Sequence, residues 1–176
     1  RPAGCGGPAV PTIYDNREHV LLPRLQELLS QAVRADFCVG YMRLRGWREL
    51  APHIEHFEGG GERCCRVLVG MFESPRQAAG RGQAFLPPAD TLDGPARARR
   101  FEEALADFRA QLERGLPTHE AEAALRQLAR QLRSGKVRVR LFLDYPLHAK
   151  LYLIERSDSV SPLVGFVGSS NLTLAG

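Results

Sequence analysis

Hydrophobic side chains near the start of the chain recur at spacings of three and four residues, which is typical of one face of an α-helix. The stripe consists of Val20, Leu21, Leu25, Leu28, Leu29, Ala32 and Val33. Asp15 or Asn16 precedes it, and either side chain is suited to cap the first turn by accepting backbone N–H bonds. The pattern therefore predicts a helix that starts after this cap and buries one face.

Two short apolar runs follow, and each predicts a buried strand. They cover residues 37–42 and 66–71. Between them, residues 47–57 predict a second helix with Trp47 in the core, and the three glycines at 59–61 mark its end.

The middle of the chain predicts two longer helices. Residues 96–114 and 118–134 both have helical spacing, and Gly115 and Pro117 separate them. The expected apolar stripes are Leu105, Phe108 and Leu112 in the first helix and Ala121, Leu125, Leu128 and Leu132 in the second. Residues 72–95 are rich in Gly, Pro, Arg and Gln without a clear period, which predicts a long loop or an insertion.

The C-terminal part of the chain predicts three strands. Apolar residues alternate with Arg138 and Arg140 over 137–143, alternation returns over 148–154, and 163–168 form the last apolar run. Helices that alternate with strands and end in a strand cluster predict an α/β domain with a mixed sheet flanked by helices.

Length and composition fit one such domain. The chain has 176 residues, of which 44% are hydrophobic and 25% charged, and this profile excludes a disordered protein. No apolar run approaches the roughly 18 residues of a membrane helix, and the start lacks a signal-peptide core, so we expect a cytoplasmic protein that does not bind a membrane. Residues 1–12 are expected to be a flexible lead-in and 13–176 the domain. Because the chain starts without Met, we interpret it as a fragment of a longer protein.

Charge and cysteines narrow the chemistry only slightly. A net charge of +4 is compatible with a polyanionic partner, but a solvated arginine-rich surface explains it equally well. The cysteines, Cys5, Cys38, Cys64 and Cys65, have no Cys-x-x-Cys spacing for zinc, so we expect reduced thiols. On a strand, the adjacent Cys64 and Cys65 would point to opposite faces.

Most other polar residues are interpreted as ordinary surface. This applies to four histidines without a partner at metal-binding spacing: His19, His53, His56 and His119. Arginines 97, 99 and 100 share a predicted helix with Glu102, Glu103 and Asp107, which favours a salt-bridged solvated face over a nucleic-acid contact. For Arg138 and Arg140 the two interpretations are balanced.

The informative feature is His148-Ala149-Lys150, which is followed by Gly168-Ser169-Ser170-Asn171. On a strand, His148 and Lys150 would share one face. A neutral imidazole can attack phosphorus, an ammonium and an amide can hold the non-bridging oxygens, and a serine hydroxyl can orient the imidazole. The pattern predicts a phosphoryl-transfer site, and we expect no metal or other cofactor because no cluster of carboxylates accompanies it.

This arrangement resembles the signature of the phospholipase D superfamily, which has His-x-Lys, an acid after four further residues and a Gly-Ser-x-Asn turn. The acid position falls on Glu155, where the family usually has aspartate, and the loop after it is longer than in many members. The resemblance implies a phospholipase D-like half domain with a phosphohistidine intermediate at His148. It also implies phosphate binding by Lys150 and Asn171, and supporting roles for Glu155, Ser169 and Ser170.

The earlier part of the chain is loosely similar to the phospholipase D-like module at the start of bacterial helicases of the SNF2 and DEAD-box type. The similar segments are 15–18, 38–42, 46–47 and 66–70. The resemblance implies a metal-independent nuclease domain that acts on DNA and is linked to a helicase motor in its parent protein. The chain contains no Gly-x-x-x-x-Gly-Lys-Ser/Thr loop, so it should not itself bind ATP.

A single His-x-Lys copy leaves such a site incomplete, because in-line displacement needs a nucleophile on one side of phosphorus and a proton donor on the other. In the resembled family, two copies meet at a pseudo-twofold axis. We therefore expect a homodimer with a composite site, or a second half elsewhere in the parent. Two alternatives are a catalytically silent nucleic-acid-binding or dimerisation module and a phospholipid-cleaving enzyme. The second is disfavoured because the sequence has no interfacial amphipathic helix with aromatic anchors.

Overall fold

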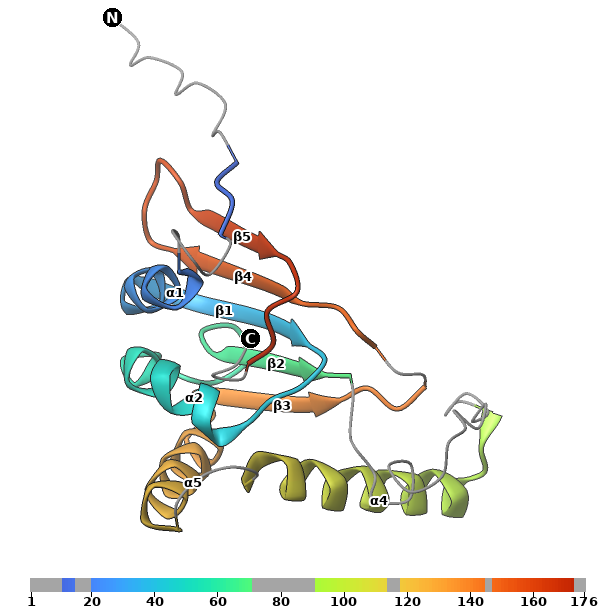
Figure 1. The fold of residues 1–176 in the computed structure, drawn as a ribbon. Helices are drawn as coiled ribbons and strands as arrows, with labels where there is room; N and C mark the ends of the chain where they lie inside the picture. Colours follow the sequence, from blue (N-terminus) through green and yellow to red (C-terminus); the bar gives the residue numbers. More distant parts are fainter. Residues whose placement is uncertain (1–10, 15–19, 71–90, 114–117, 145–146, 173–176) are drawn as a thin grey trace, which may run out of the picture.

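The structure is a computed structural model that describes residues 11–14, 20–70, 91–113, 118–144 and 147–172. Its elements in chain order are α1 (Leu21–Ser30), β1 (Ala32–Val39), α2 (Leu44–Leu50), the short 3-10 helix η1 (Ala51–Ile54), β2 (Cys65–Val69), α4 (Gly94–Glu113), α5 (Thr118–Arg133), β3 (Val137–Leu141), β4 (Leu151–Arg156) and β5 (Leu163–Val167) (Figure 1). The predicted α/β class with a mixed sheet is confirmed. Most of the predicted loop or insertion, and most of the lead-in, lie outside the described residues.

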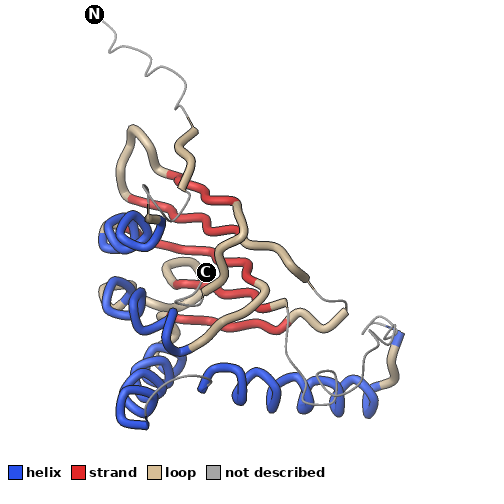
Figure 2. Tube along the Cα trace, in the orientation of Figure 1, coloured by secondary structure: helices blue, strands red, loops and turns tan. Residues whose placement is uncertain are grey.

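The sheet has five strands in the order β3-β2-β1-β4-β5. Strands β1, β2 and β3 are parallel, β4 is antiparallel to β1, and β5 is antiparallel to β4, as the arrows in Figure 1 show. Figure 2 shows the strands side by side in one sheet, with the helices apart from them. As a result, β1, β2, β3 and β5 all end at one edge of the sheet, and β4 starts there. We call this edge the carboxyl edge. In open α/β sheets, ligands bind outside the carboxyl ends of the strands.

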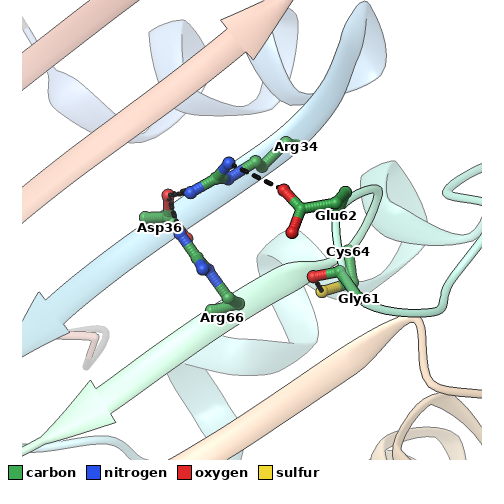
Figure 3. A network of polar contacts seen from close by, with 6 residues as sticks. All are labelled: Arg34, Asp36, Gly61, Glu62, Cys64 and Arg66. Carbon is green, nitrogen blue, oxygen red and sulfur yellow. Dashed lines mark hydrogen bonds and ion pairs between the residues drawn. The ribbon is translucent and has the colours of Figure 1, made fainter.

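The strand register divides the sheet into two faces. Phe37 of β1 is in register with Val67 and Tyr152, and all three are buried in the main core. The neighbouring Asp36 is in register with Arg66 on the opposite face, which lies in front of the strands in Figure 3, with helices behind. We call this second face the open face, because none of the described helices covers it.

The first helix is shorter than predicted. It ends at Ser30, and Ala32 and Val33, which the apolar stripe assigned to it, begin β1 instead. Residues 35–39 alternate between the core and the open face, as a strand does, and β1 begins three residues before them, at Ala32. Ala32 and Val33 therefore belong to the strand. The predicted caps, Asp15 and Asn16, lie outside the described residues.

The predicted helix over residues 47–57 is interrupted. Its α-helical part ends at Leu50 and continues as η1, where Pro52 has no N–H to donate to the helical ladder. Trp47 is fully buried, so the prediction that it belongs to the core is confirmed.

The buried face of α5 is rotated relative to the predicted one. Leu125 and Leu132 were expected in the core but are 39% and 42% exposed, whereas Leu128 is buried as predicted. Gln131 is also buried, and its Oε1 accepts a hydrogen bond from the Trp47 indole at 3.0 Å. A buried indole N–H needs an acceptor, so a polar side chain occupies a core position of this helix.

The cysteines behave as predicted where the structure describes them. Cys38, Cys64 and Cys65 are free thiols, and burial raises the pKa of each above its ordinary value. Cys65 faces the main core, whereas Cys64 Sγ lies 3.7 Å from the carbonyl oxygen of Gly61 beside the open face (Figure 3). Cys5 lies outside the described residues.

Two strands form the edges of the sheet. The β3 edge carries Arg138 and Arg140, whereas β5 has no charged side chain, and its Leu163 and Val167 are 60% and 85% exposed. Among the described helices, none is both long enough and apolar enough to cross a membrane.

Candidate active site

The segments that leave and enter the strands at the carboxyl edge are tied together by backbone hydrogen bonds. Gly70, directly after β2, donates to Val39 O at 3.0 Å, and Leu147 donates to Gly70 O at 2.9 Å. Gly168, directly after β5, donates to Lys150 O at 3.2 Å. The His148–Lys150 segment therefore lies beside the start of the Gly-Ser-Ser-Asn turn, although Lys150 and Gly168 are 18 positions apart in the sequence.

Gly70 makes this close approach possible. A Cβ atom at this position would lie 2.4 Å from Leu147 Cβ and 2.5 Å from the Leu147 carbonyl oxygen. Both distances are shorter than non-bonded atoms tolerate. The absence of a side chain thus lets the segment before His148 cross the end of β2.

The two motif residues His148 and Lys150 do not lie on a strand, as the alternation predicted. Strand β4 starts at Leu151, and the preceding residues bond to Gly70 through Leu147 instead of extending the strand. Lys150 is buried, whereas His148 is exposed. The prediction that both residues lie on a strand is therefore wrong.

The ammonium group of Lys150 is the buried charge of this edge. The side chain is only 6% exposed, and Nζ donates to the carbonyl oxygen of His148 at 2.9 Å. It forms no ion pair with a carboxylate of the described residues. A buried ammonium without a counter-charge is unfavourable by several kcal/mol, so this position favours a bound anion.

Asn171 is fixed by the segment after β1. Its Oδ1 accepts a hydrogen bond from Tyr41 N at 3.0 Å, and the next residue pairs with the same segment, because Leu172 N donates to Tyr41 O at 3.2 Å. With Oδ1 engaged, the Nδ2 group of Asn171 has no partner among the described residues. It is available to donate to a phosphate oxygen.

Tyr152 connects the turn to the sheet. Its hydroxyl group donates to Ser170 O at 2.8 Å, and its ring packs edge-to-face on Phe37 at a centroid distance of 5.0 Å. Burial raises the pKa of Tyr152 well above its ordinary value, so the phenol is the neutral donor in this bond. Ser169, one residue earlier in the turn, is exposed.

The structure does not bring Glu155 to this group of residues. It lies five residues after Lys150, and this odd spacing along β4 places it on the open face. Five strand residues also span about 17 Å, so the carboxylate lies near the opposite end of the strands from the carboxyl edge.

Arg138 and Arg140 also lie away from Lys150. Both are exposed on β3, three strand positions from β4, which corresponds to about 14 Å. Nearby, Arg34 and Arg66 both bind Asp36, with Arg34 Nε and Arg66 Nη2 at 3.0 and 2.7 Å from Oδ2 (Figure 3). Arg34 also pairs with Glu62 in the loop before β2, at 3.4 Å, so two arginines face two carboxylates here. The β3 arginines form no ion pair with a described residue.

Two contributors to the site were not predicted. The backbone of residues 41–43 holds the turn, because Arg43 N donates to Leu172 O at 3.0 Å in addition to the Tyr41 bonds. Arg43 Nε is buried and has no hydrogen-bond partner in the described structure. Residues 37–42 form one apolar run in the sequence, which concealed that β1 ends at Val39 and the chain then turns to meet the site.

A lysine, an asparagine and a histidine at the carboxyl edge of a mixed sheet define this protein as an α/β domain with a candidate anion-binding site. No protein-family model matches the chain, and no curated protein is significantly similar to it. In the described ranges, no three His, Cys, Asp or Glu side chains are grouped so that they could hold a metal ion.

Proposed function

We propose that the carboxyl edge is one half of a phosphodiesterase site and that the protein cleaves nucleic acid, with DNA as the expected substrate. The observation that carries this proposal is the position of Lys150, a buried ammonium that lacks a carboxylate partner among the described residues. A phosphodiester supplies the missing negative charge. Asn171 adds a fixed amide donor on the neighbouring segment.

The proposed reaction has two displacements at phosphorus. In the first, the neutral imidazole of His148 forms a nitrogen–phosphorus bond while the bond from phosphorus to the leaving oxygen breaks. Lys150 and Asn171 hold the non-bridging oxygens, and a second imidazole protonates the leaving oxygen. In the second displacement, water attacks phosphorus, its proton passes to the second imidazole, and His148 is released.

The second imidazole is proposed to be His148 of the partner subunit. A twofold axis at the carboxyl edge brings the same surface of both copies together and provides one histidine for each side of phosphorus. Lys150 and Asn171 of both copies would then line one shared cleft. A second motif copy linked to this one, the arrangement that the resemblance implies, would serve equally, because it would supply the same group.

A second candidate is a catalytically silent module that binds nucleic acid. The observation in its favour is that Glu155, the acid of the motif, lies near the opposite end of the strands from the carboxyl edge, and no described carboxylate bonds to His148. An imidazole without an orienting partner is a poorer nucleophile. This module would retain the anion site of Lys150 and lose the chemistry.

The test is His148→Asn, assayed on labelled single-stranded DNA, duplex DNA and a chromogenic phosphodiester, with and without EDTA. We expect cleavage by the unmodified protein that persists in EDTA and falls by at least about a thousandfold in the variant, because loss of a covalent nucleophile removes the reaction path. The matched control is His119→Asn, which changes an exposed histidine on α5 and should cleave normally.

The outcomes separate the candidates. Cleavage that survives in a folded His148→Asn protein contradicts the nucleophile. Salt-sensitive DNA binding by the unmodified protein without any cleavage supports the silent module instead.

A further inference from the structure

The helix α4 buries one face along only part of its length. Ala104, Phe108 and Leu112 lie on this face and are 7%, 6% and 5% exposed. Phe101 continues the same stripe one turn earlier but is 45% exposed. Figure 1 shows that the first half of α4 extends beyond the carboxyl edge of the sheet, so none of the described strands covers the stripe there.

Two arginines share this part of the stripe. Arg97 precedes Phe101 by four residues, and Arg100 is its neighbour on the side of Ala104. Arg100 Nη2 donates to Asp144 O at 3.3 Å, in the connection between β3 and β4. Their shared helix face therefore points towards the body of the protein at the carboxyl edge.

The distance from this face to the candidate active site is short. Asp144 precedes His148 by four residues, and four residues of fully extended chain span at most about 14 Å. One short oligonucleotide is therefore long enough to contact both places, since single-stranded sites on nucleic-acid-binding folds take about 4–16 nucleotides.

We propose that Phe101, Arg97 and Arg100 form a second contact, which selects single-stranded nucleic acid and rests on the proposed function of the carboxyl edge. The Phe101 ring stacks on one base, and the two guanidinium groups bind the phosphates on either side. The base must be unpaired, because a base within a duplex has both faces covered by its neighbours. The strand leaves this contact towards His148.

Binding is measured by fluorescence anisotropy in the His148→Asn background, which keeps the probe uncleaved. The probes are a labelled oligothymidylate of about 15 nucleotides, within the range of such sites, and a duplex of the same length. We expect Phe101→Leu to weaken binding of the single strand about five- to a hundredfold, as expected for the loss of one stacked base, and to leave duplex binding unchanged. Phe101→Trp should restore the affinity, because tryptophan also stacks.

The charge contribution is tested on the same turn of the helix. Arg97→Gln should weaken binding and reduce its dependence on salt, because one phosphate contact is lost. Arg99→Gln is the matched control: it removes the same charge from an exposed residue on the opposite side of α4 and should have a smaller effect.

Single-strand affinity that is unchanged in Phe101→Leu overturns this inference, and so does an equal loss for single strand and duplex, which would indicate a general surface contact. These outcomes are independent of cleavage. A protein that cleaves DNA without any Phe101 effect contradicts only the second contact. A protein that never cleaves but binds single strands through Phe101 contradicts only the phosphodiesterase proposal.

Discussion

At the scale of single residues, Tyr152 couples the fold to the candidate site. Its buried hydroxyl group holds Ser170, and burial raises its pKa above the ordinary value of about 10. Above about pH 10 the unfolded chain loses the phenol proton while the folded chain keeps it. The unfolded state then binds fewer protons, so this contribution to stability is complete below about pH 10 and is lost as the pH rises further.

The substitution Tyr152→Phe tests this coupling. We expect it to lower the free energy of unfolding by about 1 kcal/mol at neutral pH, because Ser170 O loses its donor. The difference from the unmodified protein should shrink above about pH 10, where only the unmodified protein loses the contribution of the phenol. Urea unfolding at both pH values measures this, and a difference independent of pH would show that the phenol is not shielded from solvent.

Residues also show where sequence-based prediction succeeded and where it failed. Trp47 was correctly assigned to the core, because exposing so large an apolar side chain to water is unfavourable. Gln131 was missed because helical stripes are counted in apolar residues, although the indole of Trp47 requires a polar partner inside the core. Likewise, the contact between Tyr41 and Asn171 spans 130 residues, and neither local sequence contains a signal for it.

At the scale of elements, the predicted order of helices and strands was largely correct, whereas several boundaries were not. Strand β4 was expected to start at His148 because apolar and polar residues alternate from there. It starts at Leu151 because pairing with β1 and β5 begins there, and pairing is a property of three segments rather than one. Glu155 is a different case: its spacing of five from Lys150 along a strand already implied the opposite face and a distance of about 17 Å, but the motif resemblance was given more weight.

Gly70 provides the test at this scale. We expect Gly70→Ala to lower the free energy of unfolding by about 1–3 kcal/mol, as for other overpacked positions, and to reduce cleavage by displacing the segment before His148. Gly61→Ala is the matched control, because a Cβ at this position meets no atom within 4 Å. Urea unfolding and the cleavage assay measure both effects. A Gly70→Ala protein that matches the control in both would show that Leu147 does not press on this glycine.

At the scale of the whole molecule, the proposed composite site makes a prediction about assembly. If two copies meet at the carboxyl edge, His148→Cys places two thiols across the twofold axis, within reach of a short bismaleimide. We expect this variant to form a cross-linked dimer and the unmodified protein to have a dimeric mass by light scattering. Ser157→Cys serves as the control, because Ser157 is exposed just after β4, at the opposite end of the strands from the carboxyl edge.

Cross-linking that is equally efficient at both positions would indicate random collision. A monomeric protein that still cleaves DNA would contradict the two-histidine reaction.

The uncharged β5 edge, where Tyr14 packs on Phe166, has a consequence for how the protein behaves in solution. An edge strand offers a row of free N–H and C=O groups, and charged residues usually discourage other chains from adding to it. The five residues of β5 carry no charge, and two of their apolar side chains are largely exposed. At high protein concentration we therefore expect other chains to add strands to this edge one after another, which turns a clear solution cloudy. One lysine in place of Val167 should keep the solution clear.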